Sequence, residues 1–138
     1  MAEGRTLAPG TAEGEALVLA EPLSFWGGME PASGKVVDAH HPQRGELLTG
    51  RIVVMPSGRG SSSASSVLAE AIRAGTAPAA VLLLEADPIV ALGSVVASEL
   101  YGASCPVVVL DAADYERLRT GDRLRVIADD DAGRVEPA

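Results

Sequence analysis

Residues 51–74, RIVVMPSGRGSSSASSVLAEAIRA, predict a strand, a glycine- and serine-rich loop and a helix in direct succession. Residues 51–55, which are apolar after Arg51, are typical of a strand. Residues 61–74 carry apolar side chains at helical spacing and are followed by Gly75, which suits a helix end. A second continuous apolar run, at 79–84, is typical of a strand that is buried on both faces. The centre of the chain therefore predicts alternating strands and helices.

The alternation continues toward the C-terminus. Asp87 and Pro88 are predicted as the N-cap and first residue of a helix at 88–100, because both residue types favour these positions. Asp111 is predicted to cap a helix that reaches Arg119. Strands are predicted at 107–110 and 123–127, the latter pairing with 134–136, and before residue 51 at 5–7, 15–19 and 35–37. The predicted fold class is α/β: one domain over residues 1–138, with a β-rich N-terminal half packed on an alternating strand–helix core.

Composition limits the possible function classes. The 138 residues are 47% apolar and carry a net charge of -8, partly from the acidic run at 129–131, which is expected in a solvated turn. Such a surface does not favour nucleic acid or an anionic membrane. No apolar run approaches the roughly 20 residues of a membrane span, and residues 1–5 lack signal-peptide order, so the expected location is cytoplasmic. A small anionic substrate needs only one local positive site.

The metal-binding residue types are few. Cys105 is the only cysteine, which excludes an internal disulfide, and its apolar surroundings predict a buried thiol. One thiol cannot hold an iron–sulfur cluster, so no metal or cofactor is expected on this chain and any cluster must come from another one. His40 and His41 are expected in a surface or interface loop, with contact to a substrate as the alternative.

The loop at 56–66 is the candidate site. Gly58 and Gly60 permit a tight turn, and the first N–H groups of the following helix have no partners within the helix. With the helix dipole, these donors favour a carboxylate or phosphate, to which Arg59 and the serine hydroxyls add further donors. The alternative is a connector whose serines only cap the helix, although one serine would suffice for that. The loop lacks the lysine of a P-loop and the pattern of a nucleophile elbow.

Several further segments occur in a fixed order with this loop: EPLSFWGGMEP at 21–31, GRGSSSASS at 58–66, GTAPA at 75–79, DPIVALG at 87–93 and LYGASCP at 100–106. Together they resemble the swivel-domain subunit of the aconitase X family. The resemblance implies a swivelling β/β/α domain and a large partner subunit that carries an iron–sulfur cluster. Since no such partner follows in this chain, it resembles the form in which the two subunits are separate.

The resemblance also implies a reaction. Members of the family remove water from cis-3-hydroxy-L-proline or from mevalonate 5-phosphate, and both substrates are anions that lose a proton next to a carboxylate. The cluster would act as Lewis acid on the leaving hydroxide. The Ala-, Gly- and Arg-rich composition suggests a GC-rich genome and favours the hydroxyproline reaction, with mevalonate 5-phosphate as the alternative.

By the same resemblance a loop serine is the base, Ser61 first and Ser62 second. Its alkoxide would need stabilisation by Arg59 and the helix amides. Ala64 stands where the family commonly has glycine. Residues expected to contact the substrate are Gly58, Arg59, Gly60, Ser63 and Gly28. Phe25 and Trp26 are expected either in the core or on a surface that contacts the large subunit or the substrate.

Two rival functions remain open. Residues 93–102 and 105–107 also resemble the swivelling phosphohistidine domains of phosphoenolpyruvate-using enzymes. Those phosphoryl carriers need a histidine in the glycine-rich segment before this helix, and neither histidine of this chain lies there. The other rival is a non-catalytic anion-binding module that regulates a partner.

Overall fold

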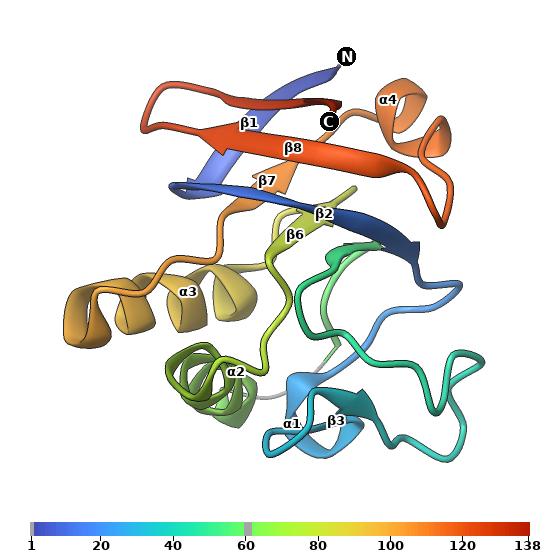
Figure 1. Ribbon diagram of the computed structural model, residues 1–138, viewed down its shortest axis with the longest axis vertical. Helices are drawn as coiled ribbons and strands as arrows, with labels where there is room; N and C mark the ends of the chain where they lie inside the picture. The colour runs from blue at the N-terminus through green and yellow to red at the C-terminus, as the bar shows by residue number, and fades with distance from the viewer. Residues whose placement is uncertain (1, 60–61) are drawn as a thin grey trace.

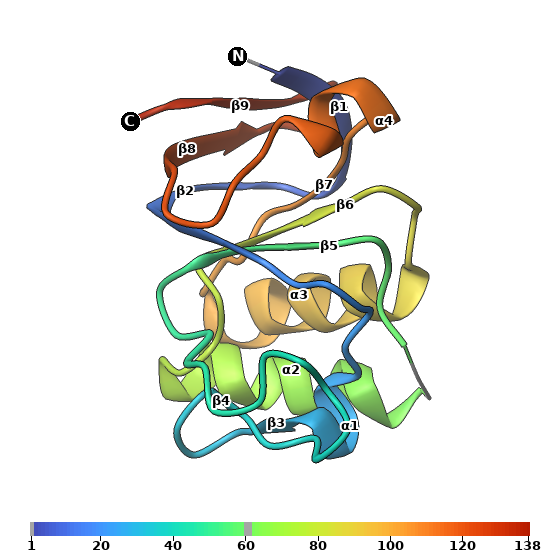
Figure 2. The same ribbon diagram turned by 90° about the vertical axis from the view of Figure 1, so that its right-hand side faces the viewer.

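A closed barrel forms one end of the molecule. The computed structural model describes residues 2–59 and 62–138, and its barrel strands follow the order β1-β7-β6-β5-β2-β8-β9. Figures 1 and 2 show the barrel above two helices, with a small third layer beneath them. The strands are β1 (Ala2–Ala8), β2 (Gly10–Val18), β5 (Ile52–Met55), β6 (Ala80–Leu83), β7 (Val107–Val109), β8 (Arg123–Ala128) and β9 (Gly133–Pro137).

The parallel part of the barrel confirms the predicted alternation of strands and helices. β2, β5, β6 and β7 are parallel neighbours in that order. Helix α2 (Ser63–Ala74) connects β5 to β6, and α3 (Pro88–Tyr101) connects β6 to β7. Parallel neighbours need such crossovers because the chain must return to the same edge before each new strand. All four residues of β5 and of β6 are buried, as their apolar runs predicted.

The α/β class is confirmed, but the two halves of the chain do not form separate layers. β8 and β9 come from the C-terminus and pair with each other, as predicted, and also with β2 and β1 from the N-terminus. The helix predicted to end at Arg119 is shorter than expected: α4 spans Ala112–Glu116. After α4 the chain must turn into β8, which pairs with β2. Gly121, at a φ of 98°, lies in this turn and donates its N–H to Ala16 O of β2 at 2.9 Å.

Two apolar clusters use opposite faces of the same strands. Ile52 and Val54 of β5 point into the barrel, whereas Val53 and Met55 face the helices, because side chains alternate along a strand. The cluster that contains Val53 and Met55 also contains Leu68 of α2 and reaches the third layer. This layer consists of α1 (Phe25–Gly28), β3 (Met29–Glu30) and β4 (Lys35–Val36). The helices are therefore held between the barrel and a small antiparallel ribbon.

The predicted cap of α3 and the predicted end of α2 are confirmed. The Asp87 carboxylate accepts the N–H groups of Ile89 and Val90 at 2.9 and 3.2 Å, and Gly75 ends α2 at a φ of 80°. Over residues 2–59 and 62–138, none of the helices has the length and apolar character needed to cross a bilayer.

Candidate functional site

The loop after β5 is attached to the segment that precedes α1. Gly58 forms a bridge with Leu23, and the Arg59 N–H donates to Leu23 O at 3.2 Å. A Cβ on Gly58 would lie 2.3 Å from Asp87 Oδ2 and 2.9 Å from Val90 Cγ2. A side chain at position 58 would therefore require the side chains of Asp87 and Val90, at the start of α3, to move.

This arrangement leaves a cavity of about 140 Å³ between the loop and the two helices. Most of its described lining residues are apolar, and the two charged ones are Arg59 and Asp87. The described lining residues are Leu23, Phe25, Gly58, Arg59, Ala64, Asp87, Ile89 and Val90. The volume is below the roughly 300–1,000 Å³ of pockets that bury drug-sized ligands. The cavity therefore suits a small molecule or one part of a larger, shared site.

The two helices that begin beside this cavity differ at their N-termini. α3 is capped by the Asp87 carboxylate, whereas among the described residues α2 has neither a side-chain cap from Ser62 nor an acidic residue in its first turn. Ser62 and Ser63 are exposed, and the Ser65 hydroxyl bonds back to Ser62 O at 2.7 Å. Because no described side chain caps the start of α2, the positive end of the helix dipole at this point favours an anion.

The Arg59 side chain has an acidic partner that was not anticipated. Its Nη2 atom lies 3.8 Å from Glu21 Oε1, and the two side chains are 55% and 51% exposed. Exposed pairs of this kind contribute little to stability. An incoming carboxylate can therefore replace Glu21 on Arg59 at small cost.

The structure brings together only part of the predicted site. Gly58 and Arg59 line the cavity, and Ser62 and Ser63 lie at the start of α2. Gly60 and Ser61, the latter the first-choice base, lie outside the described residues. Gly28 is buried, and the position of its missing Cβ is 2.8 Å from Leu23 Cδ1. Gly28 thus supports the cavity wall through Leu23, and its contact with substrate stays a prediction.

Some residues of the site were missed or left undecided. The sequence predicts Asp87 only as a helix cap. Because the N-cap pattern is local, it does not indicate that Asp87 also lines the cavity. Phe25 is 1% exposed and belongs to the core that lines the cavity, whereas Trp26 is 60% exposed. Trp26 is therefore available for contact with the large subunit, whereas Phe25 could reach only a molecule bound in the cavity.

The histidine loop has a structural role that corrects the expectation of a surface loop for His41. His41 is 5% exposed, its Nε2 lies 3.0 Å from Glu21 O, and its Nδ1 accepts the Gln43 N–H at 3.1 Å. Since Nδ1 accepts, the proton is on Nε2 and donates to Glu21 O. The ring therefore fixes the backbone of the residue that pairs with Arg59.

The donor set does not suit an iron–sulfur cluster. Cys105 is buried, as predicted, and desolvation raises its pKa from the ordinary value of 9.0 to about 12. Cluster ligands are thiolates, so this thiol is a poor one. Over residues 2–59 and 62–138, no three His, Cys, Asp or Glu side chains converge to hold a metal ion.

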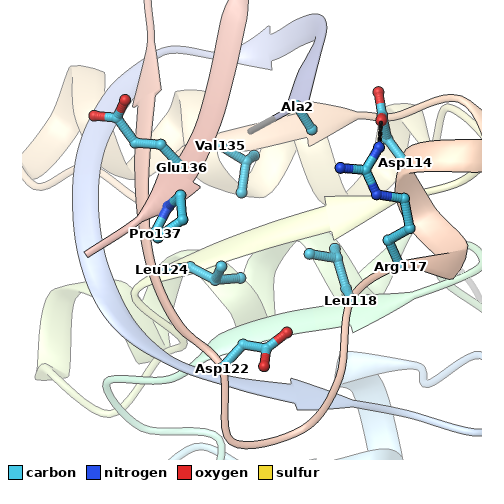
Figure 3. Close-up of a pocket in the computed structure, with 9 residues that line it drawn as sticks. All are labelled: Ala2, Asp114, Arg117, Leu118, Asp122, Leu124, Val135, Glu136 and Pro137. Carbon is cyan, nitrogen blue, oxygen red and sulfur yellow. Dashed lines mark hydrogen bonds and ion pairs between the residues drawn. The ribbon is translucent and has the colours of Figure 1, made fainter.

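A second cavity, of about 160 Å³, is lined by residues near both termini (Figure 3). The termini lie at the barrel end of the molecule, away from α2 (Figure 1). Three acidic residues, Asp114, Asp122 and Glu136, share its wall with Arg117. Arg117 is already paired with Asp114 at 3.3 Å, as Figure 3 shows. This charge distribution does not favour an anion, so the cavity beside α2 is the better candidate.

Comparisons with known proteins agree with this geometry. Residues 1–136 match the family model described as the aconitase X swivel domain. A cis-3-hydroxy-L-proline dehydratase of Pseudomonas aeruginosa is 54% identical over 106 residues, which are 77% of this chain and 18% of that protein. The chain thus spans about a fifth of the length of the dehydratases of this name that it matches.

Two relatives match over nearly their whole length. The phosphomevalonate dehydratase small subunit of Thermococcus onnurineus is 37% identical over 134 residues, 97% of each chain. A crystal structure of Thermococcus kodakaraensis aconitase X in its holo-form superimposes with a TM-score of 0.82 at 38% identity, covering 96% of this chain and 95% of that one. On the family match, these identities and the shared fold, the chain belongs to the aconitase X swivel domain family.

Proposed function

We propose that this chain is the swivel-domain small subunit, one domain over residues 1–138, of a hydro-lyase that dehydrates a small hydroxy-carboxylate. The observation that carries the proposal is a small cavity whose wall contains Arg59 and the beginning of α2, where no described side chain caps the helix. In an aconitase X swivel domain, this is where negative charge can be held while a proton leaves the carbon next to a carboxylate.

The substrate that the relatives favour is cis-3-hydroxy-L-proline, with pyrroline-2-carboxylate as the product. The support is the 54% identity to a dehydratase of that name, against 37% to a phosphomevalonate dehydratase small subunit. The second candidate is mevalonate 5-phosphate, and the full-length match to that small subunit favours it.

In the proposed reaction the substrate carboxylate binds the first N–H groups of α2 and displaces Glu21 from Arg59. The base, Ser61 or as second choice Ser62, takes the proton from the carbon that bears the carboxylate. The electron pair of that C–H bond forms a double bond to the neighbouring carbon, whose C–O bond breaks and releases hydroxide. The enamine then tautomerises to the pyrroline. Arg59 and the α2 amides stabilise the alkoxide of the base and the negative charge on the substrate carboxylate.

The proposal includes a large aconitase X-type partner. The cavity is small, and the described residues offer no group suited to receive the leaving hydroxide. The iron–sulfur cluster expected from the family resemblance is assigned to that partner, because Cys105 is a poor ligand. A cytoplasmic location stays a prediction.

The test is co-expression with the large partner and an anaerobic assay on both candidate substrates. Turnover should require both chains and should fall by at least about 100-fold in either Ser61→Ala or Ser62→Ala, within the range that general bases contribute. Ser66→Ala, an exposed serine further along α2, is the matched control and should keep full activity. Full activity in both loop variants of an intact complex would reduce the loop to a binding element.

A further inference from the structure

Asp87 has a carboxylate oxygen that its helix does not need. Oδ1 accepts the N–H groups of Ile89 and Val90 and completes the cap of α3. Oδ2 is turned toward Gly58, on the cavity wall that also carries Arg59. Serine or asparagine would cap the helix equally well, so neither the charge of Asp87 nor its second oxygen is required by the fold.

The cavity wall carries charges of both signs. Arg59 and the start of α2, which no described side chain caps, contribute positive charge. The Asp87 carboxylate contributes negative charge. The described charged groups of the wall sum to zero, and the nearby Glu21 makes the surroundings more negative.

This pattern matches a zwitterion better than a polyanion. An amino acid with a ring nitrogen brings one carboxylate and one ammonium group on the same carbon. A hydroxy acid with a phosphate brings a further anionic group, which would face Asp87 without compensation at a cost typical of like charges held close together. The same cavity therefore discriminates between the two substrate classes named for the relatives.

We propose that Asp87 is a specificity-determining residue whose Oδ2 accepts a hydrogen bond from the ring ammonium group of a cyclic amino-acid substrate. The inference rests on the proposed function for the identity of the site. With the ammonium on Asp87 and the carboxylate on Arg59 and α2, the carbon between these two groups is fixed from both sides. Its C–H bond is then held in a defined orientation relative to the loop serines.

The test compares two ring carboxylates, L-proline and cyclopentanecarboxylate, which differ in the ammonium group. Their binding to the complex with the large partner is measured by calorimetry. Wild-type complex should bind L-proline about 10- to 100-fold more tightly, the range expected of a charge-assisted hydrogen bond. Asp87→Asn, which keeps a capping oxygen and removes the charge, should reduce this preference at least tenfold. Asp87→Ser, a second capping variant, should act in the same way.

Asp111→Asn is the matched control, because Asp111 caps α4 by accepting the Asp114 N–H at 2.9 Å and lies outside the lining of this cavity. It should leave the preference unchanged. An unchanged preference in both Asp87 variants, or no preference for L-proline in the wild type, overturns the inference. Turnover of cis-3-hydroxy-L-proline in the same preparations tests the proposed function separately, since binding selectivity is measured without it.

Discussion

Substitution of Gly93 by alanine separates local helix preference from tertiary packing. Gly93 is buried in the middle of α3, where α3 crosses α2. Helix propensity alone predicts that alanine stabilises the helix by about 1 kcal/mol. The structure predicts the opposite sign, because the new Cβ would lie 2.8 Å from the Ser65 carbonyl oxygen and 3.1 Å from Leu68 Cβ.

The size of the effect follows from these contacts. Ordinary contact begins at 3.4 Å, so the closest pair is 0.6 Å too close (3.4 minus 2.8). The opposing atom belongs to the backbone of α2, and relief therefore requires the two helices to separate. Such overpacking costs about 3 kcal/mol at the upper end of its usual range. After subtraction of the propensity gain, the free energy of unfolding should fall by about 2 kcal/mol, with a Tm lower by roughly 5–10 °C.

Thermal and urea unfolding of the purified chain measure this change. Ser98→Ala, at an exposed position of the same helix, is the control and should leave Tm equal or slightly higher. A Gly93→Ala protein that is as stable as the wild type would refute the close packing of α2 on α3. Because Ser65 lies near the start of α2, the same variant should also lower dehydratase turnover, measured in the complex with the large partner.

Three other variants test single features. Gly75→Ala should cost about 1–2 kcal/mol in urea unfolding through left-handed strain at a φ of 80° alone, because nothing lies within 4 Å of the new Cβ. Glu21→Gln should leave Tm within about 2 °C and lower KM for the anionic substrate up to about fivefold, since Arg59 loses an exposed partner. Burial raises the pKa of Cys105 from 9.0 to about 12, so the unfolded chain loses this proton first as pH rises. The associated stability is complete below pH 9 and lost toward pH 12, and Cys105→Ala should reduce that decline in unfolding measured across this window.

Local signals explain how much of the fold was predictable. The buried runs of β5 and β6, the Asp87 cap and the Gly75 stop were identified correctly because each depends on residues close together in the chain. The glycine–serine loop is predicted to be an anion site on a local signal of the same kind, because it directly precedes an amphipathic helix. The proposed roles of its serines came from the family resemblance.

Long-range contacts account for the rest. The sequence alone determined the α/β class, the start of α3, the end of α2 and the candidate loop, since hydrophobic period and capping act over a few residues. Only the tertiary structure decided that β1 and β2 close a barrel with β9 and β8, more than 100 residues away. It also placed Asp87 against Gly58, and His41 under Glu21 beside Arg59. No local sequence pattern in one of these segments indicates its contact with the other. The packing of the barrel against the two helices determines each of these contacts.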